Sequence, residues 1–163
     1  MAVGPSRDRR YTRPIADRRA GFTDMAYDTS NVFARILRGE IPSHKVYEDQ
    51  HTLAFMDVMP QADGHTLVIP KAPAENILDV PPDALAATIL TTQRVARAVK
   101  QAFAAPGILV AQLNGSAAGQ SVFHIHFHVV PRHAGLDLRF HARDMADHNL
   151  LAGHAARVRA ALD

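Results

Sequence analysis

The sequence contains no cysteine, so it has no disulfide framework, no thiolate metal site and no cysteine nucleophile. It also has no apolar run that approaches the length of a transmembrane helix. The first residues lack the apolar stretch of a secretory signal peptide, and the formal net charge is only +2. These absences favour a cytoplasmic protein with no membrane partner.

The chain does have ample apolar content and many histidines. Its 163 residues, 47% of them hydrophobic, are enough for one domain with a sizeable core. The 10 histidines are many for this length. Three of them lie within residues 124–128, which makes that stretch the most informative part of the sequence.

The N-terminal segment, residues 1–24, is rich in arginine and nearly free of large apolar residues. Such a segment buries too little surface to offset the entropy of ordering it. We therefore expect a disordered extension, followed by a single domain over residues 25–163 that ends in a helix, and we favour Met25 as the natural start. A basic arm for nucleic acid is a second interpretation. Tyr11 is the one aromatic residue interleaved with the arginines, which is too little for base stacking, so we expect no specific nucleic-acid partner. A targeting peptide is a third, and the aspartates argue against it.

The periodicity of apolar residues predicts short strands and three helices. Ser30 or Asn31 can cap a helix over residues 32–37, which Gly39 ends. Alternating residues predict four strands, over 45–48, 52–58, 65–69 and 108–113. A terminal helix is expected over 147–162. Pro81-Pro82-Asp83 opens the longest helix, whose inward positions are Leu85, Ile89, Thr92, Ala96, Val99 and Phe103.

A fifth strand is predicted over residues 121–131, where three histidines alternate with apolar residues. Alternate residues of a strand share a face, so the three histidines line one face while the apolar residues enter the core. Pro131 should end the strand because proline cannot donate to a ladder. On a straight strand the outer histidines are about 13 Å apart, so the three cannot ligate one metal but can line one groove. They are His124, His126 and His128.

This stretch resembles the signature of the histidine triad (HIT) superfamily of nucleotide hydrolases and transferases, in which three histidines are each followed by apolar residues. The similarity covers residues 31–133 and is carried by 31–42, 55–58, 65–71, 114–115 and 119–121. Within the superfamily the chain most resembles the Hint-like branch of purine nucleoside phosphoramidate hydrolases. The resemblance implies an α+β fold, a five-stranded antiparallel sheet with a long helix and a short N-terminal helix packed on it. We expect the helices on one face. The resemblance also implies a homodimer formed by the long helix and the fourth strand.

The resemblance assigns His126 as the nucleophile that attacks the α-phosphate and forms a covalent nucleotidyl-histidine, which water then cleaves. Imidazole suits this step because its neutral form needs no deprotonation. An acceptor must hold its Nδ1–H so that the attacking tautomer is fixed. His124 and His128 would flank it, contact phosphate and assist the leaving group. The related uridylyltransferases have glutamine where this chain has His128, which favours hydrolysis over transfer.

Further site residues follow from the resemblance. Glycines, backbone N–H groups and the Ser121 hydroxyl of the loop over residues 114–121 suit the binding of phosphate. Asn114 and Gln120 are implied as polar groups of the active site. Asp57 would bind the ribose hydroxyls, and His65 matches a further nucleotide-binding histidine near the Hint-like active site. An ordinary hairpin loop, a solvated aspartate and a structural histidine are the alternatives. Phe33, Ile36 and Phe55 are candidates for a base pocket or for plain core.

The function expected from the resemblance is hydrolysis of a nucleoside phosphoramidate or adenylylated compound. It would release a purine nucleoside monophosphate and need no cofactor or metal. One alternative is a dinucleoside polyphosphate hydrolase of the same superfamily. Another is a non-catalytic, zinc-binding interaction protein, in which two triad histidines share a zinc ion with His65 or His133. Residues 135–140 do not match the Hint-like C-terminus, which leaves the leaving group open.

Overall fold

The computed structural model describes residues 27–135 and 144–162, so the extension predicted over residues 1–24 lies outside the described residues. Five antiparallel strands form one sheet in the order β1-β2-β3-β5-β4, which confirms the predicted α+β class. The strands are β1 (Lys45–Glu48), β2 (Thr52–Met56), β3 (Thr66–Pro70), β4 (Gly107–Ala111) and β5 (Phe127–Arg132). The helices are α1 (Val32–Leu37), α2 (Pro82–Ala102) and α3 (His148–Ala160), with a 3-10 turn η1 (Ser116–Ala118). Within the described ranges no helix has the length and hydropathy needed to cross a bilayer.

The short helix α1 begins and ends as the sequence predicts. Its N-cap is Asn31, whose side-chain oxygen accepts a hydrogen bond from Ala34 N–H at 2.9 Å. Gly39 follows the last turn with a φ of +74°, a left-handed conformation that glycine adopts without strain. These two features determine where α1 begins and ends before the chain continues to β1.

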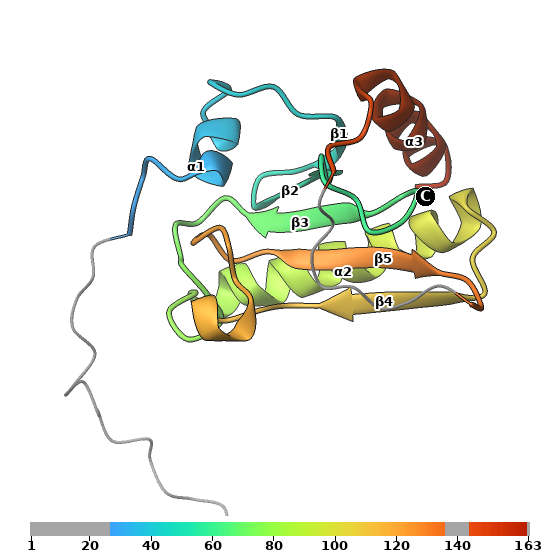
Figure 1. Cartoon of the computed structure of the whole chain (residues 1–163). Helices are drawn as coiled ribbons and strands as arrows, with labels where there is room; N and C mark the ends of the chain where they lie inside the picture. Colours follow the sequence, from blue (N-terminus) through green and yellow to red (C-terminus); the bar gives the residue numbers. More distant parts are fainter. Residues whose placement is uncertain (1–26, 136–143, 163) are drawn as a thin grey trace, which may run out of the picture.

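Helices cover both faces of the sheet, so the expectation that they lie on one face is wrong for α1. Alternate residues of β2 and β3 belong to different cores. Ala54, Met56 and Val68 pack in the core that includes residues of α2 and α3. The opposite core joins Phe33 and Ile36 of α1 to Leu53, Phe55, Leu67 and Ile69. In Figure 1, α2 runs behind the sheet, and α1 lies away from α2, beside β2.

The long helix α2 buries part of the predicted face and part of a neighbouring one. Thr92, Val99 and Phe103 are buried as predicted. Buried positions include Thr88, Thr91 and Val95, whereas Ile89, a predicted inward residue, is 45% exposed. The threonines can be buried because their hydroxyls are satisfied. Thr88 donates to the carbonyl of Ala84 at 2.6 Å, and Thr91 is hydrogen-bonded to Thr52 on β2 at 3.0 Å.

The strand predicted over residues 121–131 is wrong in its first half. β5 begins only at Phe127, and the chain before it bends while Ile125 N–H donates to the carbonyl of Ala74 at 2.9 Å. The apolar alternation still holds, because Ile125, Phe127 and Val129 all enter the core beneath α2. Pro131 does not end the strand but pairs with Ile108 of β4. This is possible because β3 pairs with β5 no further than Val129, so proline's missing N–H removes no bond on that side.

Candidate active site

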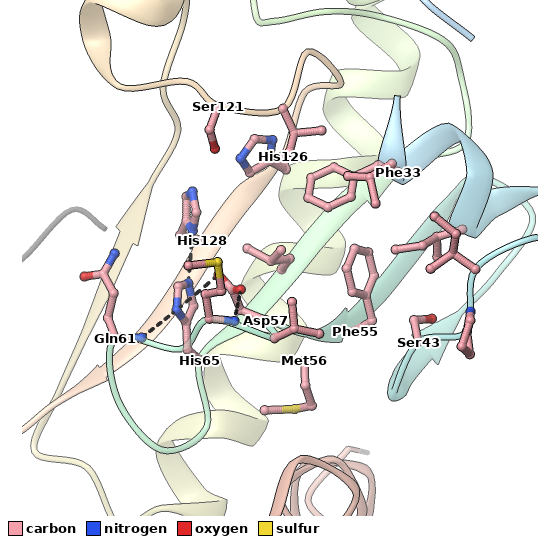
Figure 2. Close-up of a pocket in the computed structure, with 18 of the residues that line it drawn as sticks. Phe33, Ser43, Phe55, Met56, Asp57, Gln61, His65, Ser121, His126 and His128 are labelled. Atoms are coloured by element: carbon pink, nitrogen blue, oxygen red, sulfur yellow. Dashed lines mark hydrogen bonds and ion pairs between the residues drawn. The ribbon is translucent and has the colours of Figure 1, made fainter. Parts of the chain in front are cut away.

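A pocket of about 450 Å³ opens between α1, the end of β2 and the chain that leads into β5. Its two sides differ in chemistry, as Figure 2 shows. One side is apolar and is formed mainly by Phe33, Ile36, Ile41, Phe55 and Leu67. The other side carries polar groups from Asp57, His65, Ser121, His126 and His128. A pocket of this kind can hold a flat apolar ring next to a polar or anionic group.

His126 lies in the pocket wall with one ring nitrogen held by the main chain. Its Nδ1 is 2.7 Å from the carbonyl oxygen of His124. Because a carbonyl oxygen can only accept, the proton lies on Nδ1 and the neutral ring keeps its lone pair on Nε2. Burial lowers the pKa of His126, which favours the neutral form. The acceptor that the predicted mechanism requires is therefore present.

His124 lies behind the pocket and is not among the residues that line it. It is fully buried, and its Nε2–H donates to the carbonyl of Pro70 at 2.9 Å. The hydroxyl of Tyr27 is hydrogen-bonded to its Nδ1. Burial lowers the pKa of His124 to about 4, so the ring is neutral. The structure thus does not support the expected contact of His124 with phosphate, because both ring nitrogens are already bonded.

His128 is joined to His65, which the sequence also places near the site. His65 Nδ1 accepts the main-chain N–H of Gln61 at 3.1 Å, so its other nitrogen, Nε2, carries the proton. That proton is donated to His128 Nδ1 at 3.0 Å. The donation leaves His128 to carry its own proton on Nε2 when it is neutral. These hydrogen bonds are drawn in Figure 2.

Asp57 follows the end of β2. Its Oδ2 atom lies 3.4 Å from Nδ1 of His65. This contact is not an ion pair, because burial lowers the pKa of His65 to about 3 and keeps the ring neutral. Burial raises the pKa of Asp57 to about 6, although a hydrogen bond from Met59 N–H opposes the shift. Asp57 is therefore an ionised but poorly solvated carboxylate at neutral pH, one that gains from new hydrogen-bond donors.

Three of these residues could also hold a metal ion. Asp57, His65 and His128 can each offer one ligand atom such that the three atoms lie within 4.8 Å of one another. Two imidazole nitrogens with one carboxylate oxygen are a donor set that zinc accepts. The predicted pair of triad histidines is not this set, since His128 alone of the triad takes part.

Asn114 and Gln120 hold the loop before the triad and do not line the pocket. The side-chain oxygen of Asn114 accepts Ile77 N–H at 2.9 Å. Gln120 is buried, accepts Gly115 N–H at 2.7 Å and donates to the carbonyls of Glu75 and Val122. Their polar groups thus shape the loop that brings Ser121 to the pocket. Their direct contact with a ligand stays a prediction.

The sequence did not single out Tyr27 or Gln61. Tyr27 is 97 positions from His124, and no local pattern links them. Gln61 orients His65 through its main-chain N–H, a role that residue type does not reveal.

Comparisons with known proteins identify the family of the chain. A family model described as "HIT domain" matches residues 38–135. Protein hit of Bacillus subtilis is 43% identical over 102 residues, which are 63% of this chain and 70% of that protein. Adenosine 5'-monophosphoramidase HNT1 of Saccharomyces cerevisiae is 37% identical over 105 residues, 64% of each chain.

Solved structures show the same likeness. A Hit-like protein from Bartonella henselae, described as involved in cell-cycle regulation, is 48% identical with a TM-score of 0.79, over 84% of this chain and 100% of that one. A zinc-bound histidine triad family protein from Mycobacterium smegmatis is 40% identical with a TM-score of 0.72, over 82% of this chain and 93% of that one.

Proposed function

The chain belongs to the HIT domain family, and we propose that it is a hydrolase that cleaves nucleoside phosphoramidates or adenylylated compounds at the α-phosphate. The observation that carries this proposal is the state of His126. Its Nδ1–H is held by a carbonyl, and its Nε2 keeps a lone pair in a ring that lines the pocket. The yeast relative named as an adenosine 5'-monophosphoramidase supports the choice of substrate class.

The two sides of the pocket fit the parts of a nucleotide. The base would lie between the apolar residues, where Phe33 and Phe55 meet edge to face with ring centroids 5.4 Å apart. The ribose hydroxyls would donate to the carboxylate of Asp57, which is short of partners after burial. The phosphate would then lie near Ser121, whose hydroxyl can donate to it, and within reach of His126.

The reaction takes two displacements at phosphorus. First, Nε2 of His126 attacks the α-phosphorus, a new N–P bond forms, and the bond from phosphorus to the leaving nitrogen breaks. The leaving amine needs a proton, and His128 carries one on Nε2. Second, a water attacks the phosphorus while its proton returns to His128, and the N–P bond to His126 breaks. The products are a free amine and a nucleoside monophosphate, and both histidines return to their starting states.

The proposal is tested with AMP-morpholidate as substrate and the His126→Gly variant. We expect wild-type protein to release AMP, and the variant to lose at least about 1000-fold in kcat. Its Kd for AMP should change little, because Asp57 and the apolar wall stay in place. The matched control is His148→Ala, which removes an exposed histidine bonded only to His44 among the residues described. Near-normal turnover by the glycine variant would refute the mechanism. Faster turnover of diadenosine polyphosphates than of the phosphoramidate would instead favour a dinucleoside polyphosphate hydrolase.

A zinc-binding role is the second candidate. It is favoured by the cluster of Asp57, His65 and His128 and by the zinc-bound Mycobacterium smegmatis relative. The measurement is turnover before and after chelation with EDTA, with metal analysis of the same samples. We expect turnover to survive, since His126 supplies the nucleophile without a metal. Loss of turnover that zinc alone restores would establish the metal as part of the enzyme.

We also propose that the chain forms a homodimer through α2 and β4. β4 is at the edge of the sheet, and Val110 on it is 43% exposed. On α2, Ile89 and Leu90 are 45% and 67% exposed. A second copy placed about a twofold axis would cover these apolar side chains and extend the sheet. That arrangement would also explain why the apolar spacing of α2 predicts a buried position for Ile89.

A further inference from the structure

Tyr27, the first residue that the structure describes, contacts the histidine triad from outside the pocket. Its ring meets that of His124 edge to face, with centroids 5.6 Å apart, and its hydroxyl is hydrogen-bonded to His124 Nδ1. Neither residue is among those that line the pocket. Its contact with the triad is therefore made through His124 and not from inside the pocket.

Hydrogen bonds at both nitrogens determine where the proton of His124 lies. The carbonyl of Pro70 can only accept, so Nε2 carries the proton and Nδ1 accepts the hydroxyl proton of Tyr27. Burial raises the pKa of Tyr27, so the phenol stays protonated and can donate. A single neutral tautomer of His124 satisfies both partners.

His124 in turn provides the acceptor that orients His126, through its own carbonyl oxygen at 2.7 Å. The segment that contains both residues lies outside the strands, so it lacks the ladder of main-chain bonds that holds β5. Ile125 N–H anchors it once, to Ala74. The buried ring of His124, held at both nitrogens, is a second anchor for the same segment.

We propose that Tyr27 is a positioning residue for the triad: its hydroxyl holds the ring of His124, and the main chain of His124 then holds His126 in its attacking tautomer. The kinetic consequence rests on the proposed function. Removing the hydroxyl leaves Nδ1 of a fully buried ring without a donor, which favours a turned ring. Because the pocket walls stay the same, the loss should fall on kcat and not on binding.

The test compares Tyr27→Phe with Tyr47→Phe in the full chain. Phenylalanine keeps the ring contact with His124 and removes only the hydroxyl. Tyr47 is the matched control, since it is also partly buried and its hydroxyl donates to Asp49 at 3.0 Å, while its ring packs in the core beneath α2. We expect Tyr27→Phe to lower kcat on AMP-morpholidate by about tenfold. Its KM and its Kd for AMP should stay within about twofold, and Tyr47→Phe should leave all three unchanged.

NMR of the imidazole nitrogens reports which nitrogen of each ring carries the proton. A general loss of stability would not change this result. In wild-type protein the proton should lie on Nε2 of His124 and on Nδ1 of His126, and Tyr27→Phe should change the His124 signals. Unchanged kcat and signals in that variant overturn the proposal. A wild-type spectrum with Nδ1 of His124 protonated also overturns it, even if the variant does not fold. If wild-type protein cleaves no phosphoramidate, the proposed function fails, while the nitrogen signals still decide the role of Tyr27.

Discussion

The ionised carboxylate of Asp57 should lower the free energy of unfolding at neutral pH. Burial raises the pKa of its carboxyl from 3.8 to about 6. Each pKa unit corresponds to about 1.4 kcal/mol, so ionising this group costs about 3 kcal/mol more in the folded than in the unfolded chain. An asparagine side chain in its place would keep the shape and avoid that cost. We therefore expect Asp57→Asn to be more stable than wild type at neutral pH.

The sign of the pH dependence follows from proton binding. Between pH 3.8 and about 6 the folded state holds the Asp57 proton more tightly than the unfolded state does, so wild-type stability falls as the pH rises. Above about pH 6 both states are ionised and the full penalty is present. The advantage of Asp57→Asn should thus grow from about 1.6 kcal/mol near pH 5 to about 3 kcal/mol near pH 8. Other groups, including the buried histidines, titrate in both proteins and largely cancel in the difference.

The assay is urea unfolding of Asp57→Asn and wild type without nucleotide across this pH range. Asp49→Asn is the control of opposite sign. Burial raises the pKa of Asp49, but hydrogen bonds from His51, Thr52 and Tyr47 outweigh it and hold the pKa below its usual value, so that variant should lose stability above pH 3.8. The difference in free energy of unfolding between Asp57→Asn and wild type should grow with pH. If it stays constant or decreases as the pH rises, ionisation of Asp57 does not destabilise the fold.

The same substitution should weaken nucleotide binding. Loss of hydrogen bonds to an ionised carboxylate costs about 1.5–3 kcal/mol, or about 10- to 150-fold in the Kd for AMP. Calorimetric titration measures this directly. If Asp57→Asn is more stable than wild type and binds AMP as tightly, Asp57 does not bind the ribose, and its predicted role is refuted.

Deleting residues 1–24 should leave the melting temperature, sedimentation and turnover unchanged, because the family match begins at residue 38 and Tyr27 is retained; a lower melting temperature or a split dimer would make the segment structural. Leu90→Glu should convert a dimer to monomers in sedimentation velocity, and a monomeric wild type would refute the interface. Gly64→Ala should destabilise strongly in thermal unfolding, since Gly64 has a φ of +88° and a Cβ there would lie 2.5 Å from the ring of Phe103. Gly39→Ala, at φ +74° with open space around it, should lose about 1 kcal/mol of stability. If Gly64→Ala loses no more than Gly39→Ala, the ring of Phe103 moves away from the new Cβ.

Local patterns predicted the elements of the fold better than their ends. β1 begins and ends where the sequence places it, and Asn31, one of the two predicted caps, caps α1. β2 stops at Met56, two residues before the predicted end, because Met56 and Thr66 are the last pair that it forms with β3. Alternation continues past that pair, but the position of the partner strand is a property of the whole fold. The same reason applies to α2, whose buried Thr91 is hydrogen-bonded to the hydroxyl of Thr52 on β2.

The candidate site shows the same division. The resemblance brought together His65, Ser121, His126 and His128, and the pocket does contain them. It could not tell side chains that face a ligand from those that hold the loop. That distinction depends on hydrogen bonds between segments far apart in sequence, such as those of Gln120 with Glu75.

The bend before β5 explains how one repeated pattern produces three different histidines. On a straight strand, alternate side chains would stand about 6.7 Å apart in equivalent settings. In the structure the rings of His126 and His128 are 4.9 Å apart, centre to centre, at 68° to each other, while His124 turns away to bond with Pro70. Two imidazoles this close can serve one phosphorus atom, one as nucleophile and the other as proton donor. A straightened segment would lose the bond from His126 to the carbonyl of His124, and with it the tautomer that the proposed mechanism requires.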